Sequence, residues 1–158
     1  FLPDEFLAKN VAAQTNVNII SWKGRCEVHE RFTAQEILAY KEQHKDIVVL
    51  AHPECSPEVI AVSDFAGSTA GMSNYVKDNQ PGKVIMVTEC SMSDNVAIEN
   101  PNVEFIRPCN LCPHMKRISL KKIYDAIRFN QHQILVDKAI IDRARLSIDR
   151  MLEIGRSS

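Results

Sequence analysis

The chain has 158 residues, of which 45% are hydrophobic and 25% charged, and its net charge at pH 7 is -1. This composition is typical of a globular protein, and the nearly balanced charge gives no electrostatic argument for binding to nucleic acid or to a membrane surface. The longest apolar runs hold roughly six residues, far fewer than a membrane-spanning helix requires. We therefore expect a cytoplasmic protein with no nucleic-acid partner and no membrane partner.

The first residues bear on how the chain is organised. Phe1 and Leu2 run directly into Pro3 and Asp4, as at the end of a buried strand that is followed by a helix, and no Met precedes them. We expect the chain to be the C-terminal part of a longer protein, or a segment cut inside a fold.

Helices and strands alternate in the predicted order. Pro3 and Pro57 stand in the first turns of apolar stretches with helical spacing, and Thr33 with Glu36 has the signature of a capping box. Short apolar runs between these stretches predict buried strands. The predicted elements are helix 3–15, strand 18–22, helix 33–44, strand 46–51, helix 57–63, helix 68–79, strand 83–88, helix 93–100, strand 103–106, helix 119–127, strand 134–136 and helix 138–154.

Single residues predict the ends of three helices. Ser93 or Asp94 is expected to cap the helix that ends near residue 100, and Ser119 to cap the helix after it. Gly155 is expected to end the last helix as its C-cap. The alternation as a whole predicts an α/β fold, in which a parallel sheet carries helices on both faces.

The five cysteines are an odd number in a chain that is large enough to fold without covalent cross-links. In a cytosolic protein such cysteines are more often free, metal-bound or catalytic than paired in disulfides. One or two cysteines follow the end of each of four successive predicted strands, and in a parallel sheet these loops share the edge where α/β proteins bind ligands. The five are Cys26, Cys55, Cys90, Cys109 and Cys112.

The loop after strand 46–51 carries a dense group of reactive side chains. His52 and Glu54 could form a general acid/base pair, or His52 could be a core histidine whose hydrogen bonds are satisfied. Further along, Ser68 and Thr69 follow a glycine and open a helix. They could bind a phosphate or carboxylate at the helix N-terminus, or they could simply cap the helix.

The motifs that contain cysteine leave several chemistries open. Cys26 with His29 could be a pair of metal ligands, a nucleophile with its base, or a loop cysteine near a solvated histidine. The Cys109-x-x-Cys112 motif could be half of a zinc site, a redox pair or part of a cluster site, or two ordinary loop cysteines. The two cysteines expected to be buried and inert are Cys55 and Cys90.

Taken together, several stretches resemble quinolinate synthase, the iron–sulfur enzyme of de novo NAD biosynthesis. They occur in the family's order with similar spacing and cover nearly the whole chain, and their combination is specific although no single piece is. The stretches are Phe1-Leu2-Pro3-Asp4, Asn10-Val11-Ala12, Trp22-Lys23-Gly24-Arg25-Cys26-Glu27-Val28-His29-Glu30, His52-Pro53-Glu54-Cys55, Asp64-Phe65-Ala66-Gly67-Ser68-Thr69, Thr88-Glu89-Cys90, Cys112-Pro113-His114-Met115-Lys116 with Leu120, and Arg150-Met151-Leu152.

The resemblance implies an enzyme that joins iminoaspartate to dihydroxyacetone phosphate, with loss of phosphate and water, to form quinolinate. It also implies three related three-layer αβα sandwich domains around a pseudo-threefold axis, with a [4Fe–4S] cluster held by one cysteine from each domain. The fourth iron position would stay open and act as a Lewis acid. The pathway implies L-aspartate oxidase as a partner, and whether the chain forms a homo-oligomer stays open.

The resemblance also implies roles for individual residues. Cys26 and Cys112 correspond to two of the three cluster ligands, and the third cysteine ligand lies outside this chain. The choice of Cys112 over Cys109 depends on the Pro-x-Met-Lys sequence that follows Cys112. The acid/base and orienting groups are His52 and Glu54, and the substrate contacts are His29, Ser68 and Thr69.

The resemblance covers only about the C-terminal half of the family's length. Residues 1–26 would complete the second domain, residues 27–105 would form the third, and residues 106–158 would complete the first. We expect the isolated chain to be inactive, because it holds two of the three cluster cysteines. The alternative is a non-catalytic metal- or thiol-binding α/β module that uses Cys109 and Cys112.

Overall fold

The computed structural model describes residues 1–156 of the chain. They form two compact units, which we call the N-terminal unit, Phe1–Lys116, and the C-terminal unit, which begins at Arg117. Among the described residues, no helix is both long enough and apolar enough to cross a membrane.

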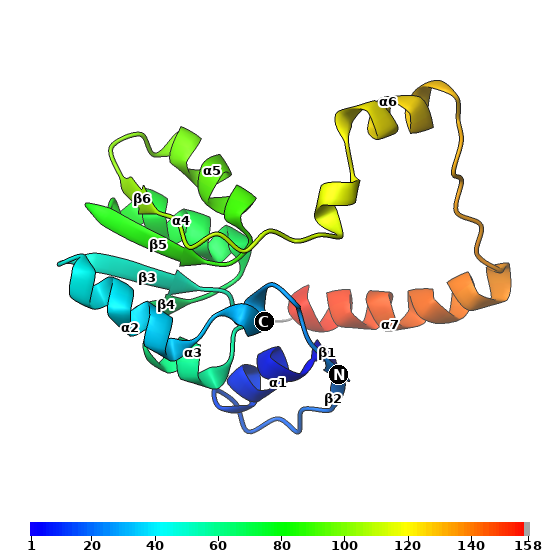
Figure 1. Cartoon of the computed structure of the whole chain (residues 1–158). Helices are drawn as coiled ribbons and strands as arrows, with labels where there is room; N and C mark the ends of the chain where they lie inside the picture. Colours follow the sequence, from blue (N-terminus) through cyan, green and yellow to red (C-terminus); the bar gives the residue numbers. More distant parts are fainter. Residues whose placement is uncertain (157–158) are drawn as a thin grey trace. The chain divides into compact units, whose positions relative to one another are not determined.

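The N-terminal unit is built on a four-stranded, fully parallel sheet in the order β4-β3-β5-β6 (Figure 1). The central pair is in continuous register, with Ile47 opposite Lys83 and Ala51 opposite Val87. The predicted α/β fold with a parallel sheet is confirmed. The strands are β3 (Ile47–Ala51), β4 (Phe65–Ala66), β5 (Lys83–Val87) and β6 (Glu104–Ile106).

Helices cover both faces of this sheet because side chains alternate along each strand. Val49 and Ala51 belong to a core with α2 and α3, whereas Leu50 and Met86 belong to a separate core with α4 and α5. Figure 1 shows the two helical layers on opposite sides of the strands, which is a three-layer αβα arrangement. The helices are α2 (Ala34–Gln43), α3 (Pro57–Ala61), α4 (Thr69–Asn79) and α5 (Cys90–Glu99).

A smaller parallel sheet forms at the start of the chain from β1 (Leu2–Asp4) and β2 (Ser21–Gly24), with α1 (Glu5–Ala12) between them. The helix predicted over 3–15 is therefore shorter, because Asp4 ends β1 and caps α1 by accepting a hydrogen bond from Leu7 N–H at 2.8 Å. The predicted strand 18–22 begins later than expected. It is not a buried run, since Ile20 is 60% exposed.

The N-terminal unit differs from the prediction at two further elements. Helix α5 begins at Cys90, before Ser93 and Asp94, because the carboxylate of Glu89 accepts a hydrogen bond from Ser91 N–H at 2.8 Å and so caps the helix. The two-residue strand β4 was not predicted at all, since so short an element has no periodicity in the sequence. The capping box at the start of α2 is confirmed, with both of its hydrogen bonds present.

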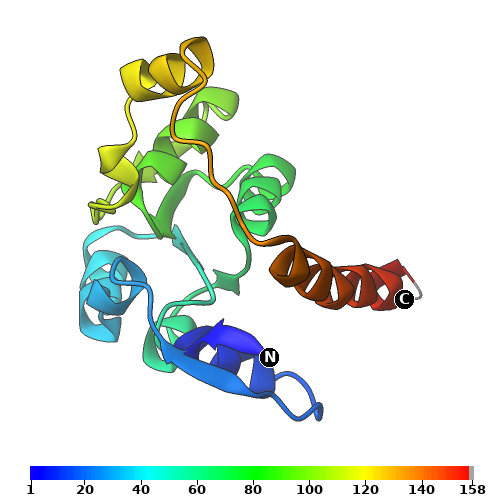
Figure 2. The ribbon, with the colours of Figure 1, turned by 90° about the vertical axis from the view of Figure 1, so that its right-hand side faces the viewer.

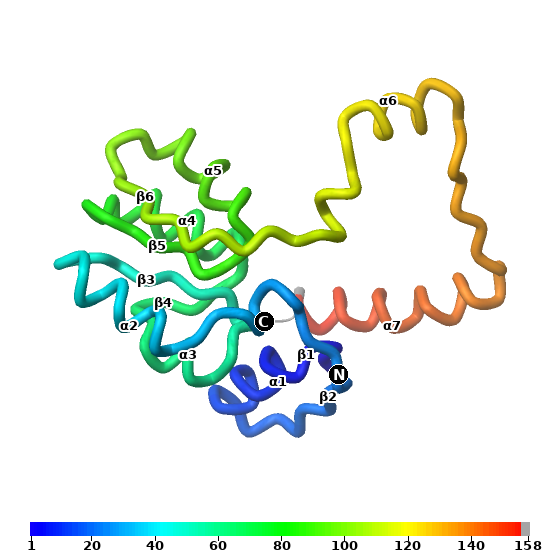
Figure 3. The backbone as a smooth tube through the Cα atoms, in the orientation of Figure 1, coloured from blue at the N-terminus to red at the C-terminus, as the bar shows by residue number. Residues whose placement is uncertain are grey.

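The C-terminal unit contains α6 (Leu120–Arg128) and α7 (Lys138–Arg156). Ser119 caps α6 as predicted, through a hydrogen bond from Lys122 N–H to its hydroxyl at 3.3 Å. Figure 2 shows α7 as one continuous helix, and it runs through Gly155, which is therefore not its C-cap. The predicted strand 134–136 is absent from the described residues, and Figure 3 shows an extended connection there instead.

Candidate functional site

The carboxyl ends of β3 and β5 meet at one edge of the sheet. Because Ala51 and Val87 are opposite each other in register, the residues that follow them lie close together, and His52 N–H donates a hydrogen bond to Val87 O at 3.2 Å. The loop after β2 reaches the same edge through the short 3-10 helix η1 (His29–Arg31). This edge is where parallel α/β sheets bind ligands.

A cavity of about 390 Å³ lies at this edge. Its lining contains six of the seven residues to which the family resemblance assigns roles, and they come from segments far apart in the sequence. These six are Cys26, His29, His52, Glu54, Thr69 and Cys112. The seventh, Ser68, does not line the cavity. Its hydroxyl accepts a hydrogen bond from Gly71 N–H at 3.1 Å, so it caps α4.

Two stacked histidines and a carboxylate form the centre of the cavity wall. The rings of His29 and His52 are 4.4 Å apart between centroids and inclined by only 8°. Glu54 Oε2 lies 3.1 Å from His29 Nδ1, and the other ring nitrogen of His29 lies 3.0 Å from Thr88 Oγ1. Glu54 N–H donates to His52 Nδ1 at 3.3 Å, so the ring proton of neutral His52 is on Nε2.

Burial controls the charge of this group. Desolvation, with a smaller contribution from His52, lowers the pKa of His29 to about 4, and desolvation also lowers the pKa of His52. Desolvation raises the pKa of Glu54, and the nearby carboxylate of Asp4 raises it further. At neutral pH the two imidazoles are therefore uncharged. Glu54 then lies beside them with a pKa shifted toward the range useful for proton transfer.

Two free cysteines line the cavity, and both are partly exposed. Cys26 is held by its backbone, whose N–H donates to the buried carboxylate of Asp4 at 3.1 Å. Cys112 Sγ accepts from Met115 N–H at 3.5 Å, in a turn that leads into the 3-10 helix η2 (Met115–Arg117). By contrast, Cys55 is fully buried, and burial raises the pKa of its thiol to about 12, so it is inert as predicted.

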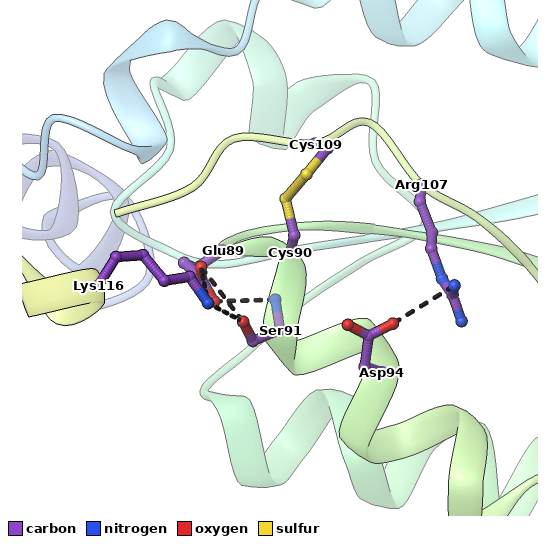
Figure 4. Close-up of a disulfide and its surroundings, with 7 residues drawn as sticks. All are labelled: Glu89, Cys90, Ser91, Asp94, Arg107, Cys109 and Lys116. Carbon is purple, nitrogen blue, oxygen red and sulfur yellow. Dashed lines mark hydrogen bonds and ion pairs between the residues drawn. A yellow bond between two sulfur atoms is a disulfide. The ribbon is translucent and has the colours of Figure 1, made fainter. Parts of the chain in front are cut away.

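The remaining two cysteines differ from the expectation that the cysteines of this chain are free, metal-bound or catalytic rather than paired. Cys90 and Cys109 form a disulfide with a Cα–Cα distance of 5.1 Å, within the usual range for such bonds (Figure 4). An isolated β-bridge between Glu89 and Asn110, beside this bond, brings the two segments together. The alternative in which Cys109 and Cys112 form a pair of thiolate ligands is therefore wrong for this structure, since only Cys112 is free.

Four residues that make polar contacts in or beside the cavity lining had no predicted role. Glu89 is 9% exposed and caps α5, and Lys116 Nζ lies 3.7 Å from its carboxylate while donating to Ser91 Oγ at 2.6 Å (Figure 4). Thr88 holds His29. The available signal was position: Thr88 and Glu89 directly follow β5, as His52 follows β3.

The donor atoms at the cavity suit a metal ion or cluster. Cys26 and Cys112 supply two free thiols to one cavity, and cysteine thiolates are the usual ligands of iron–sulfur clusters. Separately, Cys26, His29 and Glu54 each offer one ligand atom, and these three atoms lie within 4.8 Å of one another.

Comparison with known proteins agrees with the family resemblance of the sequence. The family model described as quinolinate synthetase A protein matches residues 1–153. Quinolinate synthase 1 of Mesorhizobium japonicum is 62% identical over 151 residues, which are 96% of this chain and 47% of the relative. The quinolinate synthases of Sinorhizobium medicae and Caulobacter vibrioides are 59% and 54% identical over 97% of this chain, and the matches cover 43% and 42% of those proteins. The chain thus spans about half the length of the curated relatives it matches.

Proposed function

Because the chain belongs to the quinolinate synthetase A protein family, we propose that it supplies part of the active site of a quinolinate synthase. The reaction would join iminoaspartate to dihydroxyacetone phosphate, with loss of phosphate and water, in NAD biosynthesis. The observation that carries this proposal is the single cavity that gathers Cys26, Cys112 and the polar residues expected at the site. These residues come from four separate loops, so a shared cavity is not a consequence of sequence proximity.

Cys26 and Cys112 would hold a [4Fe–4S] cluster together with a cysteine from outside this chain. When bound, the cluster would supply an open iron position that acts as a Lewis acid toward substrate oxygens. Both thiols are free and reach the same cavity, whereas the disulfide takes Cys109 out of the ligand set. This supports Cys112 as the ligand from the Cys-x-x-Cys motif.

The chain's own residues would move protons and position the substrates. Condensation, dehydration and ring closure all require proton transfer, and Glu54, whose pKa is raised by desolvation, is suited to accept and return a proton. Neutral His52, whose Nδ1 is occupied by Glu54 N–H, keeps a donor at Nε2. Thr69, in the first turn of α4, would bind a substrate carboxylate or phosphate, and Ser68 would fix the geometry of that turn.

The division of the chain among domains is also part of the proposal. Residues 27–105 contain the four-stranded sheet except for Ile106, the last residue of β6, and would form one αβα domain. Residues 1–26 and 106–158 would complete two neighbouring domains whose remaining parts are supplied from outside this chain. The cavity would then lie where the domains meet.

The experiment is an anaerobic measurement of iron and sulfide with electron paramagnetic resonance. It compares this chain, a version extended to the full length of its relatives, and Cys112→Ala and Cys109→Ala variants of that longer protein. We expect four irons per full-length chain, lost with Cys112→Ala and kept with Cys109→Ala. Equal loss from both variants, or zinc in place of iron, would overturn the cluster assignment. The 158-residue chain alone is expected to hold a labile cluster at most and to form no quinolinate.

A further inference from the structure

We propose that Cys26, His29 and Glu54 form a binding site for a single divalent transition-metal ion such as Zn²⁺, which shares Cys26 with the proposed cluster but takes its other two ligands from His29 and Glu54. This site would need neither Cys112 nor any residue outside the chain. A thiolate, an imidazole and a carboxylate are the three ligand types that zinc sites use, and three protein ligands leave the fourth position open to water.

The ligand atoms are already close to the required arrangement. His29 Nδ1 and Glu54 Oε2 are 3.1 Å apart, and the three candidate ligand atoms lie within 4.8 Å of one another. Around a tetrahedral Zn²⁺ with bonds of about 2.0–2.3 Å, ligand atoms are separated by roughly 3.3–3.8 Å. The observed separations therefore differ from these values by no more than about 1.5 Å.

The backbone around Cys26 and His29 holds both side chains on one turn. Glu30 N–H donates to Cys26 O at 3.0 Å, so the two ligands of the Cys-x-x-His motif lie on a closed turn that leads into η1. At its other end, Cys26 N–H donates to Asp4 Oδ2. The positions of the two ligands are thus fixed before any metal binds, which lowers the entropic cost of coordination.

Thr88 supplies the outer contact that a metal-binding histidine needs. If Nδ1 of His29 binds the metal, the ring proton is on Nε2, and that N–H can donate to Thr88 Oγ1 at the observed 3.0 Å. Such a hydrogen bond fixes both the tautomer and the ring orientation of the ligand. His52 is stacked on His29, but its Nδ1 already accepts from Glu54 N–H, so we do not include it among the ligands.

The charge around Glu54 also favours a cation. Among the described residues, the ion-pairing contacts of Glu54 are with the imidazoles of His29 and His52, and none is with a lysine or arginine. The buried carboxylate of Asp4 adds a second negative group nearby. A divalent ion would neutralise Glu54 and the Cys26 thiolate together. Since Cys26 is shared, occupation by zinc and assembly of the cluster would exclude each other.

The test uses the 158-residue chain and Co²⁺, which replaces Zn²⁺ and gives a thiolate-to-metal charge-transfer band. We expect one Co²⁺ per chain with this band, displaced by Zn²⁺, and at least tenfold weaker binding for Cys26→Ser, His29→Gln and Glu54→Gln. Thr88→Val should weaken binding by about tenfold, and Thr88→Ser should restore it. Circular dichroism confirms that each variant is folded, and Glu54→Gln keeps the size of the side chain.

Cys112→Ser separates this proposal from the cluster proposal. It should leave Co²⁺ binding unchanged, although the same position is expected to be essential for iron. Loss of the charge-transfer band in Cys112→Ser, or unchanged binding in both His29→Gln and Glu54→Gln, would overturn the mononuclear site. Either of those results leaves the iron measurement on the longer protein to decide the cluster independently.

Discussion

His29 shows how burial and hydrogen bonding determine the chemistry of one residue. Its side chain is 8% exposed, and each ring nitrogen has one partner, Glu54 on one side and Thr88 on the other. A neutral imidazole has one donor and one acceptor, so it satisfies both partners without a charge. Protonation would place a cation in this desolvated position beside His52, which is why its pKa falls to about 4.

This pKa predicts a pH dependence of stability. Below the unfolded pKa of 6.5, the unfolded chain binds a proton at His29 that the folded chain does not bind until about pH 4. The free energy of unfolding is therefore unaffected by protonation of His29 above pH 6.5. It decreases as the pH falls toward 4, by up to about 3 kcal/mol. His52, whose pKa is also lowered, adds in the same direction, whereas Glu54, whose pKa is raised, opposes it.

The measurement is urea unfolding of the metal-free chain between pH 4 and pH 7. His29→Gln should flatten the dependence, and the exposed His132→Gln serves as the control that should leave it unchanged. A slope in His29→Gln equal to that of the unmodified chain would show that the histidine is not desolvated as described.

Asp4 predicts a larger effect than an ordinary helix cap. Its buried carboxylate accepts two backbone hydrogen bonds, from Leu7 N–H and from Cys26 N–H. Asp4→Ala removes the cap and leaves the Cys26 amide unpaired, so it should cost about 3 kcal/mol in the free energy of unfolding. Thr33→Ala, at the exposed cap of α2, should cost only about 1 kcal/mol. Denaturant unfolding compares the two, and equal losses would contradict the double role of Asp4.

The residues of the site were largely predictable because position at a strand end is visible in the sequence. Cys26, His52 and Glu54 all directly follow strands, and reactive side chains at that edge indicate a ligand site. Ser68 caps α4, which was one of its two predicted roles, and the substrate contact that the resemblance implies for it stays a prediction. The contact between Thr88 and His29 joins residues 59 positions apart, so no local pattern could reveal it.

At the scale of single elements, predictions that depend on residues close in the sequence were correct, and one that depends on a distant partner was wrong. The start of α2 was correct because Thr33 and Glu36 form its capping box with each other. The strand predicted at 134–136 was wrong: Ile134 is 86% exposed, so the apolar run has no partner strand within the described residues. An apolar run is a strand only where another strand supplies its hydrogen bonds.

The disulfide between Cys90 and Cys109 joins the start of α5 to the loop after β6 and gives an element-scale prediction. It closes a loop with a sequence separation of 19 residues, and a loop of this length should stabilise the fold by about 3 kcal/mol. A reductant should therefore lower the urea midpoint of the unmodified chain but not that of Cys109→Ser. Thiol titration of the denatured chain should give three free thiols before reduction and five after it. Five thiols before reduction would mean that the bond does not form in solution.

At the scale of the whole molecule, burial is confined to one of the two units. Every buried residue of the described chain lies between Asp4 and Val103, and none lies in residues 117–155. The two cores on the faces of the sheet therefore supply the hydrophobic stabilisation, which grows with the apolar area removed from water. Helices α6 and α7 carry large apolar side chains that are exposed, among them Leu120 at 84% and Leu146 at 70%.

This distribution predicts that the N-terminal unit folds without the C-terminal unit. A chain that ends at Lys116 keeps the sheet, both cores and the disulfide, so its melting temperature should stay within about 3 °C of that of the full 158 residues. A shorter chain that ends at Glu99 loses β6 and the buried Val103, and it should not unfold cooperatively. Since large exposed apolar surfaces promote association, the 158-residue chain should also sediment as larger species than the chain that ends at Lys116. Calorimetry and sedimentation velocity measure both effects. A chain ending at Lys116 that lacks a cooperative transition would mean that α6 or α7 contributes to the core, contrary to the burial described here.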